Sequence, residues 1–251
     1  IADPKKSTIS FDPLGFIESY ADIDSLSAAI VDMTIQRTVD DYWQAKAKPL
    51  LSGLIAGCLM TSTGNTAPGM TEVLKLFDQL LPHEDGYSVE TPLDAMFQKI
   101  SDAAPDCYAV REFNSWHSLP YRTASCVRDT LASALSTVFP EGIRSMMQKK
   151  PQFDPVKFAS RKEALIVITS AVDRSQQYYA NLFYRFTEQQ LLRYAASCPG
   201  GELPREVRYF FDDFACTAPI QGFANAISLF RSAGLSAVIL LQSEHQLEAI
   251  Y

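Results

Sequence analysis

The sequence of 251 residues lacks the features that mark several common classes of protein. Its five cysteines are odd in number and no two have C-x-x-C spacing, which argues against a disulfide framework and against a zinc site. A reducing compartment suits such a chain. The longest apolar run, Leu50–Met60, is shorter than the roughly 20 residues that span a bilayer, and the polar start is not a signal peptide. We therefore expect a soluble chain.

An excess of basic residues is also missing. The formal charge is -7, residues 156–251 carry as many acidic as basic residues, and the acidic excess lies in residues 1–155. Neither part is basic, so bulk electrostatics do not favour a free-standing nucleic-acid binder. Hydrophobic residues make up 47% of the chain, which is enough for a large core.

Helical periodicity dominates the first part of the chain. We expect residues 1–13 to be an entry strand or linker and residues 14–155 to form an all-α domain. Asp24 is a candidate cap for a helix over the next nine residues. Apolar residues recur at three- and four-residue steps across Pro49, which we expect to kink or divide that helix.

Residues 156–251 show a different pattern, in which strands alternate with helices. Three apolar runs predict strands, and the first of them, rich in β-branched residues, suits a strand buried on both faces. Helices are expected between the strands, and a third helix is expected from His245 onward. This order predicts an α/β fold with a parallel sheet. The predicted strands are Ala164–Thr169, Glu206–Phe211 and Ser236–Gln242.

Polar side chains follow each of these strands. Asp173 comes shortly after the first strand, Asp212 and Asp213 end the second, and Gln242 ends the third. Ligands of open parallel sheets gather at the carboxyl ends of the strands. Such an aspartate suits Mg²⁺ held through water, and a neighbouring acid can activate a water molecule. The alternative is that each residue only ends a strand or caps a helix.

A phosphate-binding loop would be needed beside this aspartate pair, and the sequence has none. No glycine precedes a lysine, so the pattern G-x-x-x-x-G-K-[ST] is absent.

The stretch FFDDFACTAPIQGFANAISLFRSAGLSAVILLQSEHQLEAIY resembles the second half of the motor domain of type IV coupling proteins, the TraG/TraD-type ATPases of conjugation. Upstream, DDYWQAKAKPLLSGLIAGCL, KEALIVITSAVDRSQQYYANLFYRF and IADPKK are similar to further segments of that family. Two positions differ from the family pattern. Asp213 stands where the family has glutamate, and Lys6 stands where it has glycine.

The resemblance implies an all-α domain inserted in a RecA-like motor, the core of a P-loop NTPase. It also implies a homo-hexamer on the cytoplasmic face of the inner or plasma membrane, with its transmembrane anchor and phosphate-binding loop upstream of this chain. Residues 156–251 would be the C-terminal part of the nucleotide-binding domain. The intact protein would be an ATPase that uses ATP and Mg²⁺. We expect the present chain to bind neither, to be inactive and to be compatible with a monomer.

Carried over by position, Asp212 is the Mg²⁺ acid and Asp213 replaces the catalytic glutamate. Arg231 matches the arginine finger that acts on a neighbouring subunit's nucleotide, and Gln242 matches the sensor of the γ-phosphate. Asp173 would help to bind the cofactor. The alternatives are a solvated arginine at a helix end, a plain amide at a strand end, and a structural aspartate.

The family implies a relaxase–DNA complex or a secreted protein as cargo, and the components of the type IV secretion channel as partners. An alternative function is a non-catalytic interaction module whose all-α domain docks the cargo. A third is a Mg²⁺-dependent phosphohydrolase that uses the aspartate pair. Trp43 and Trp116 are expected in the core, not as stacking platforms for bases.

Overall fold

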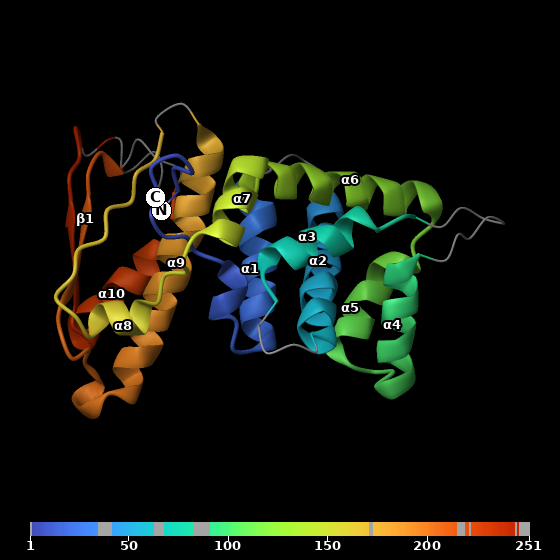
Figure 1. Cartoon of the computed structure of the whole chain (residues 1–251), viewed down its shortest axis with the longest axis horizontal. Helices are drawn as coiled ribbons and strands as arrows, with labels where there is room; N and C mark the ends of the chain where they lie inside the picture. Colours follow the sequence, from blue (N-terminus) through green and yellow to red (C-terminus); the bar gives the residue numbers. More distant parts are fainter. Residues whose placement is uncertain are drawn as a thin grey trace. The chain divides into compact units, whose positions relative to one another are not determined.

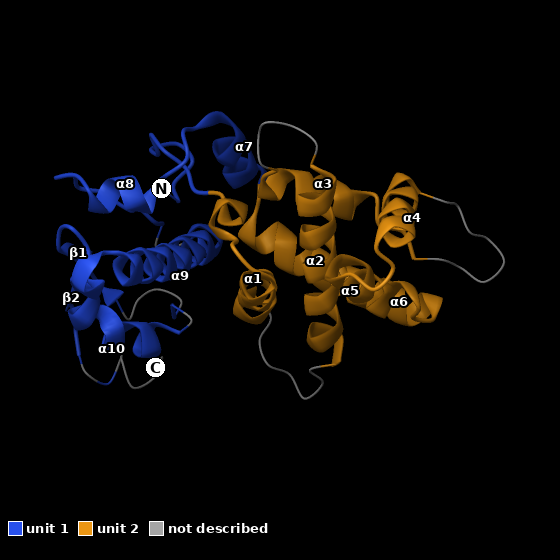
Figure 2. Cartoon of the chain, turned by 90° about the horizontal axis from the view of Figure 1, so that it is seen from below, with its two compact units in different colours: residues 1–11, 141–251 blue, residues 12–140 orange. Residues whose placement is uncertain are grey.

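The computed structural model of the chain describes residues 2–34, 42–62, 68–82, 91–170, 173–214, 219–220, 222–243 and 245 (Figure 1). The chain folds into two compact units (Figure 2). The helical unit is Asp12–Pro140, and the sheet unit combines Ile1–Phe11 with Glu141–Tyr251. These divisions differ from the domain boundaries expected after residues 13 and 155, which remain a prediction for the intact protein.

Every element assigned in the helical unit is a helix. The elements are η1 (Pro13–Phe16), α1 (Tyr20–Thr34), α2 (Tyr42–Thr61), α3 (Met70–Asp78), α4 (Pro92–Ala103), α5 (Tyr108–His117) and α6 (Tyr121–Val138).

Helix α2 is the centre of this unit and packs against α1, α3, α4, α5 and α6 (Figure 1). Its apolar residues recur on several faces, and Leu50 and Leu54 are fully buried. Helix α5 approaches α2 closely at Gly53, where an added Cβ would lie 2.7 Å from the backbone nitrogen of Phe113. The Phe113 ring then stacks on Phe97 of α4 with 3.8 Å between the ring centroids. Close approach at a glycine therefore sets the packing of three helices.

The predicted cap at Asp24 is wrong, because α1 begins at Tyr20 and Asp24 lies inside it. Asp22 supports the start of the helix, since its Oδ2 accepts hydrogen bonds of 3.0 Å from the backbone N–H groups of Glu18 and Ser19. A buried carboxylate that satisfies these donors fixes the helix start four residues before the predicted cap.

Pro49 does not divide its helix, and α2 runs unbroken from Tyr42 to Thr61. A proline inside a helix costs about 3 kcal/mol, but burial on several faces of α2 stabilises the helix on both sides of Pro49. The core position of Trp116 is confirmed, because its side chain is buried and its Nε1 donates to the Ala124 carbonyl at 2.9 Å. Trp43 is half-buried.

The sheet unit contains both helices and strands. Its elements are α7 (Glu141–Lys149), α8 (Pro155–Ala159), α9 (Arg174–Ser197), η2 (Pro199–Gly201), β1 (Val207–Phe211), α10 (Phe223–Ala233) and β2 (Leu235–Ile239).

Strands β1 and β2 are parallel, as predicted, and Val207 pairs with Leu235 at the start of the register. Helices α9 and α10 lie on the same side of both strands (Figure 1). Tyr209 of β1 stacks on Phe230 of α10, while Phe211 meets the ring of Tyr184 on α9. Alternate residues of β1 therefore bury one face of the sheet in an aromatic core.

The predicted strand Ala164–Thr169 is not formed as predicted. Ile168 makes one isolated parallel bridge with Ala2, and Ile166 is 74% exposed, so the segment is not buried on both faces. An apolar run becomes a strand only where a neighbouring backbone completes the hydrogen-bond ladder. The helix predicted from His245 onward lies outside the described residues, apart from His245 itself.

Within the described part of the chain, no helix has the length and apolar character needed to cross a membrane.

Candidate functional site

The carboxyl ends of β1 and β2 bring two of the predicted site residues together. Asp212 and Asp213 directly follow β1 and are exposed. The amide Nε2 of Gln242, three residues beyond β2, donates to Oδ1 of Asp213 at 3.2 Å. The backbone ladder continues past the strand ends, because Leu240 N–H donates to the Phe211 carbonyl at 2.9 Å. This continuation holds the two chain segments side by side and aligns their polar side chains.

Asp213 has an unusual backbone conformation, with φ of 49°. Few residues other than glycine adopt this left-handed region, and aspartate is among those that tolerate it best. The conformation turns the chain sharply after the strand while the next N–H, that of Phe214, still donates to the Leu240 carbonyl at 3.2 Å. An aspartate at this position is therefore compatible with the local backbone.

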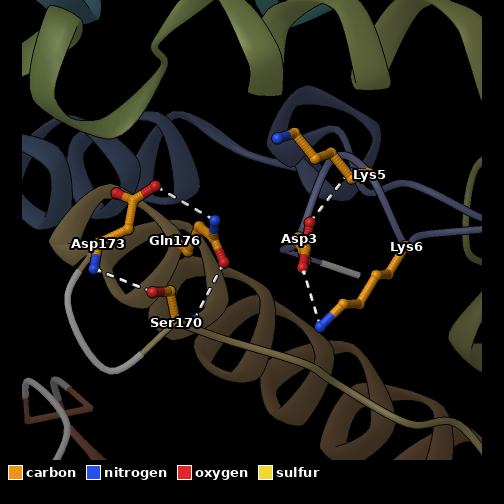
Figure 3. A network of polar contacts seen from close by, with 6 residues as sticks. All are labelled: Asp3, Lys5, Lys6, Ser170, Asp173 and Gln176. Carbon is orange, nitrogen blue, oxygen red and sulfur yellow. Dashed lines mark hydrogen bonds and ion pairs between the residues drawn. The ribbon is translucent and has the colours of Figure 1, made fainter.

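Asp173 has a well-defined structural environment at the start of α9 (Figure 3). Its Oδ1 accepts hydrogen bonds from the backbone N–H and the hydroxyl of Ser175, at 3.1 and 2.6 Å. Its Oδ2 accepts from Nε2 of Gln176 at 3.1 Å, and its own N–H donates to the hydroxyl of Ser170. The Ser175 hydroxyl is the main cause that lowers the pKa of this carboxyl. Oδ1 of Asp173 therefore caps the helix while Oδ2 binds the side chain of Gln176, and the role of Asp173 toward a cofactor remains a prediction.

The adjacent lysines Lys5 and Lys6 lie in a turn near the start of α9, in the segment IADPKK, for which the resemblance implies no site residue. The bridge between Ala2 and Ile168 places the two segments side by side (Figure 3). Asp3 shapes the turn, since its Oδ1 accepts from the backbone N–H of Lys5 at 2.9 Å and its Oδ2 lies 3.7 Å from Nζ of Lys6. Both lysines are exposed. Two adjacent lysines after an Asp-Pro pair are the sequence signal for this cationic turn.

Arg231 lies in the last turn of α10 and is exposed. It forms no ion pair with another residue in the described part of the chain. A cation at this end of a helix is stabilised by the helix dipole. Its guanidinium is thus available to an anion from outside the unit, and the structure does not bring it to the aspartate pair by a direct contact.

A cavity of 540 Å³ lies beside β1, between that strand, α9 and the segment that was predicted as the first strand. Aromatic and aliphatic side chains form much of its walls, and the buried hydroxyls of Thr187 and Tyr209 have no hydrogen-bond partner among the described residues. Glu188, the next residue on α9, is 3% exposed, and burial raises the pKa of its carboxyl to about 8. The segment and β1 line this cavity from two sides, and the predicted first strand is not assigned.

The oxygen donors at the strand ends fit a magnesium ion. Asp212 and Asp213 are adjacent, exposed carboxylates, and Gln242 adds an amide next to them. No group of three or more metal-binding side chains occurs in the described segments. Mg²⁺ commonly binds one or two carboxylates and takes its other ligands from water and phosphate oxygens. The donor set therefore suits Mg²⁺ in the presence of a nucleotide.

A family model described as "Type IV secretory system Conjugative DNA transfer" matches residues 1–251. Among solved structures, the chain is similar to the bacterial conjugative coupling protein TrwBdeltaN70 in its unbound monoclinic form. The TM-score is 0.62 and the identity 18%, over 98% of this chain and 51% of that one. The trigonal form in complex with sulphate gives a TM-score of 0.59 and 16% identity, over 98% and 52% of the two chains.

At this identity the likeness concerns the fold, and the chain spans about half the length of the solved chains. It confirms the predicted fold class, a partial RecA-like parallel sheet with an all-α domain. No curated protein matches the chain.

Proposed function

The chain belongs to the family of type IV secretory system proteins for conjugative DNA transfer, and from this premise we propose that it is part of a coupling protein. The intact protein is an ATP-driven motor that delivers DNA or nucleoprotein to a conjugative secretion channel at the cytoplasmic face of the membrane. The hydrogen bond between Gln242 and Asp213 is the observation that carries this proposal. It joins, at the carboxyl ends of two parallel strands, the residue expected to activate water and the residue expected to sense the γ-phosphate.

In this proposal the residues of the sheet unit form one wall of a nucleotide site. Asp212 would hold Mg²⁺ through water, and the bound ion would neutralise charge on the phosphate oxygens. The Asp213 carboxylate would orient a water molecule and accept its proton. The amide of Gln242 fixes the position of that carboxylate through its 3.2 Å hydrogen bond and can sense the γ-phosphate with its remaining donor.

Two further components of the site would involve residues beyond this chain: the nucleotide of a neighbouring subunit and the phosphate-binding loop. Arg231 would reach the nucleotide of the next subunit in a homo-hexamer and stabilise charge on the transferred phosphoryl group. Its exposed position without an intramolecular ion pair among the described residues supports that role. The phosphate-binding loop would come from residues outside this chain, so the chain alone is expected to release no phosphate from ATP.

The test compares ATP turnover of the intact protein with and without Asp213→Ala. Turnover should fall by roughly 10²- to 10⁴-fold, the usual contribution of a general base. Asp129→Ala is the matched control, because Asp129 is an exposed aspartate of the helical unit with 76% of its side chain accessible. Unchanged turnover in the Asp213 variant, with normal folding by circular dichroism, contradicts the assigned role.

A second candidate function is a cargo-docking module that works without catalysis by this chain. The charge of the helical unit favours it, since residues 12–140 contain 17 acidic and 8 basic residues. Such a surface suits a basic protein better than a nucleic acid. Pull-down of the relaxase–DNA complex or of a secreted cargo by the chain, in the absence of ATP, tests this function.

A further inference from the structure

An aromatic stack lies on the surface of the helical unit, where α1 and α5 begin. The rings of Tyr20 and Tyr108 are 4.5 Å apart between centroids and nearly parallel, at 19°. Tyr20 is 55% exposed, so much of its ring faces solvent. The guanidinium carbon of Arg111 lies 5.5 Å from the centroid of Tyr108. Tyrosine and arginine are the residue types that dominate binding energy at protein interfaces.

The stack is held in place by a polar contact beneath it. The hydroxyl of Tyr108 donates to Oδ1 of Asp24, and the hydroxyl of Ser52 lies 3.2 Å from the same oxygen. Ser52 is buried and also contacts Ser27 at 3.0 Å, which ties the group to α2 and α1 together. A ring that is already fixed loses little conformational entropy when a partner binds. Asp24 therefore positions an aromatic surface instead of capping its helix.

An exposed carboxylate precedes each of the two tyrosines in the sequence, just before the helix that the tyrosine begins. Glu18 lies two residues before Tyr20, Asp106 lies two residues before Tyr108, and both acids are exposed. The nearby cation of Arg111 is already engaged, with its Nε 3.2 Å from Oε1 of Glu112. Together with the acidic excess of the unit, these groups attract a cation and repel a phosphate backbone.

We propose that the Tyr20–Tyr108 stack is a docking site for an arginine- or lysine-containing segment of a basic protein partner. A cationic side chain would lie on the open face of Tyr20, where the ring quadrupole attracts it, and the acidic excess of the helical unit would add to that attraction. The idea rests on the proposed function in one respect, since it specifies the chemistry of the cargo that the helical unit recognises. It requires neither nucleotide nor catalysis.

The experiment measures binding of the whole chain to a fluorescein-labelled 12-residue peptide of alternating serine and arginine, by anisotropy at physiological salt. Tyr20→Ala should weaken binding by roughly 3- to 30-fold, as expected for the loss of a cation–π contact, and Tyr20→Phe should retain it. Tyr121→Ala is the matched control, because Tyr121 is also an exposed tyrosine of this unit, at 43%.

Three results overturn the proposal. One is equal affinity of Tyr20→Ala and the unchanged chain, and another is an equal loss in Tyr121→Ala, which would indicate only diffuse attraction by the acidic unit. The third is tighter binding of labelled 12-residue oligothymidine than of the peptide. ATP turnover of the intact protein is measured separately, so a failure of docking and a failure of the motor can be told apart.

Discussion

Replacing Glu188 by glutamine is expected to make the stability of the sheet unit much less sensitive to pH. Glu188 lies on α9, is 3% exposed, and its Oε1 has no hydrogen-bond partner among the described residues. Burial raises the pKa of its carboxyl from 4.5 to about 8. It also raises the pKa of the neighbouring Tyr184 to about 12, with a further contribution from the charge of Glu188.

The sign follows from which state keeps the proton. Between pH 4.5 and about 8 the folded unit holds the Glu188 proton while the unfolded chain releases it. The contribution of Glu188 to stability is therefore full below pH 4.5 and falls as pH rises through this window, by up to about 1.4 kcal/mol for each pH unit. Over the whole window the loss amounts to roughly 5 kcal/mol at most. Glutamine has the same shape and does not titrate, so Glu188→Gln should be several kcal/mol more stable than the unchanged chain near pH 8.

Hydrogen exchange of the α9 amides, read by mass spectrometry between pH 5 and pH 8 and corrected for intrinsic exchange, measures this directly. Fluorescence provides an internal control, because both tryptophans, Trp43 and Trp116, lie in the helical unit and should report no effect. Glu163→Gln is the matched variant, since half of the Glu163 side chain is exposed, at 49%. The reasoning is refuted if α9 in the Glu188 variant loses stability with pH as steeply as it does in the unchanged chain.

Three more predictions concern other parts of the structure. Gly53→Ala should destabilise the helical unit by about 1–3 kcal/mol in urea unfolding, because the new Cβ would lie 2.7 Å from the backbone nitrogen of Phe113. This loss should outweigh the normal preference of a helix for alanine over glycine. The same change at Gly15, where an added Cβ meets no atom within 4 Å, should cost little. Burial raises the pKa of Asp12 to about 6, so stability should fall from pH 4 to 6, and Asp12→Asn should remove that fall in tryptophan fluorescence. Asp173→Ala should lower thermal stability by about 1 kcal/mol because α9 loses its cap, and Asp173→Ser, which keeps a capping oxygen, should retain that stability. If Asp173 also binds the cofactor, the serine variant will still lose ATP turnover in the intact protein.

Sequence alone was sufficient where the information is local. The parallel pair of strands around α10 follows from apolar runs, a helical period and the short connections between them. Asp213 and Gln242 were expected at one edge of a sheet because parallel strands end at the same edge, and the structure joins them by a hydrogen bond. The family resemblance added the expected roles, which composition and spacing do not supply.

The failures have a common physical cause, which is that each depended on a distant partner. The apolar run before Ser170 was expected to be a buried strand, but a strand needs a second backbone at ladder distance, and a cavity lies between this run and β1. Asp24 was expected to cap a helix, but Tyr108, 84 positions away, uses its carboxylate instead. The sequence offers the acid, and only packing decides which donor reaches it.

The sequence by itself determined that a helical segment is combined with an α/β segment, which family the chain belongs to, and which acids follow the strands. The tertiary structure decided which groups share a neighbourhood, because hydrogen bonds and burial depend on distances that no local pattern contains. It paired Gln242 with Asp213 and left the ring of Tyr20 exposed to solvent. It also buried Glu188, whose Oε1 has no hydrogen-bond partner among the described residues. The sequence specifies the residue types, whereas the protonation, exposure and hydrogen-bond partners of their side chains are set only when distant segments pack together.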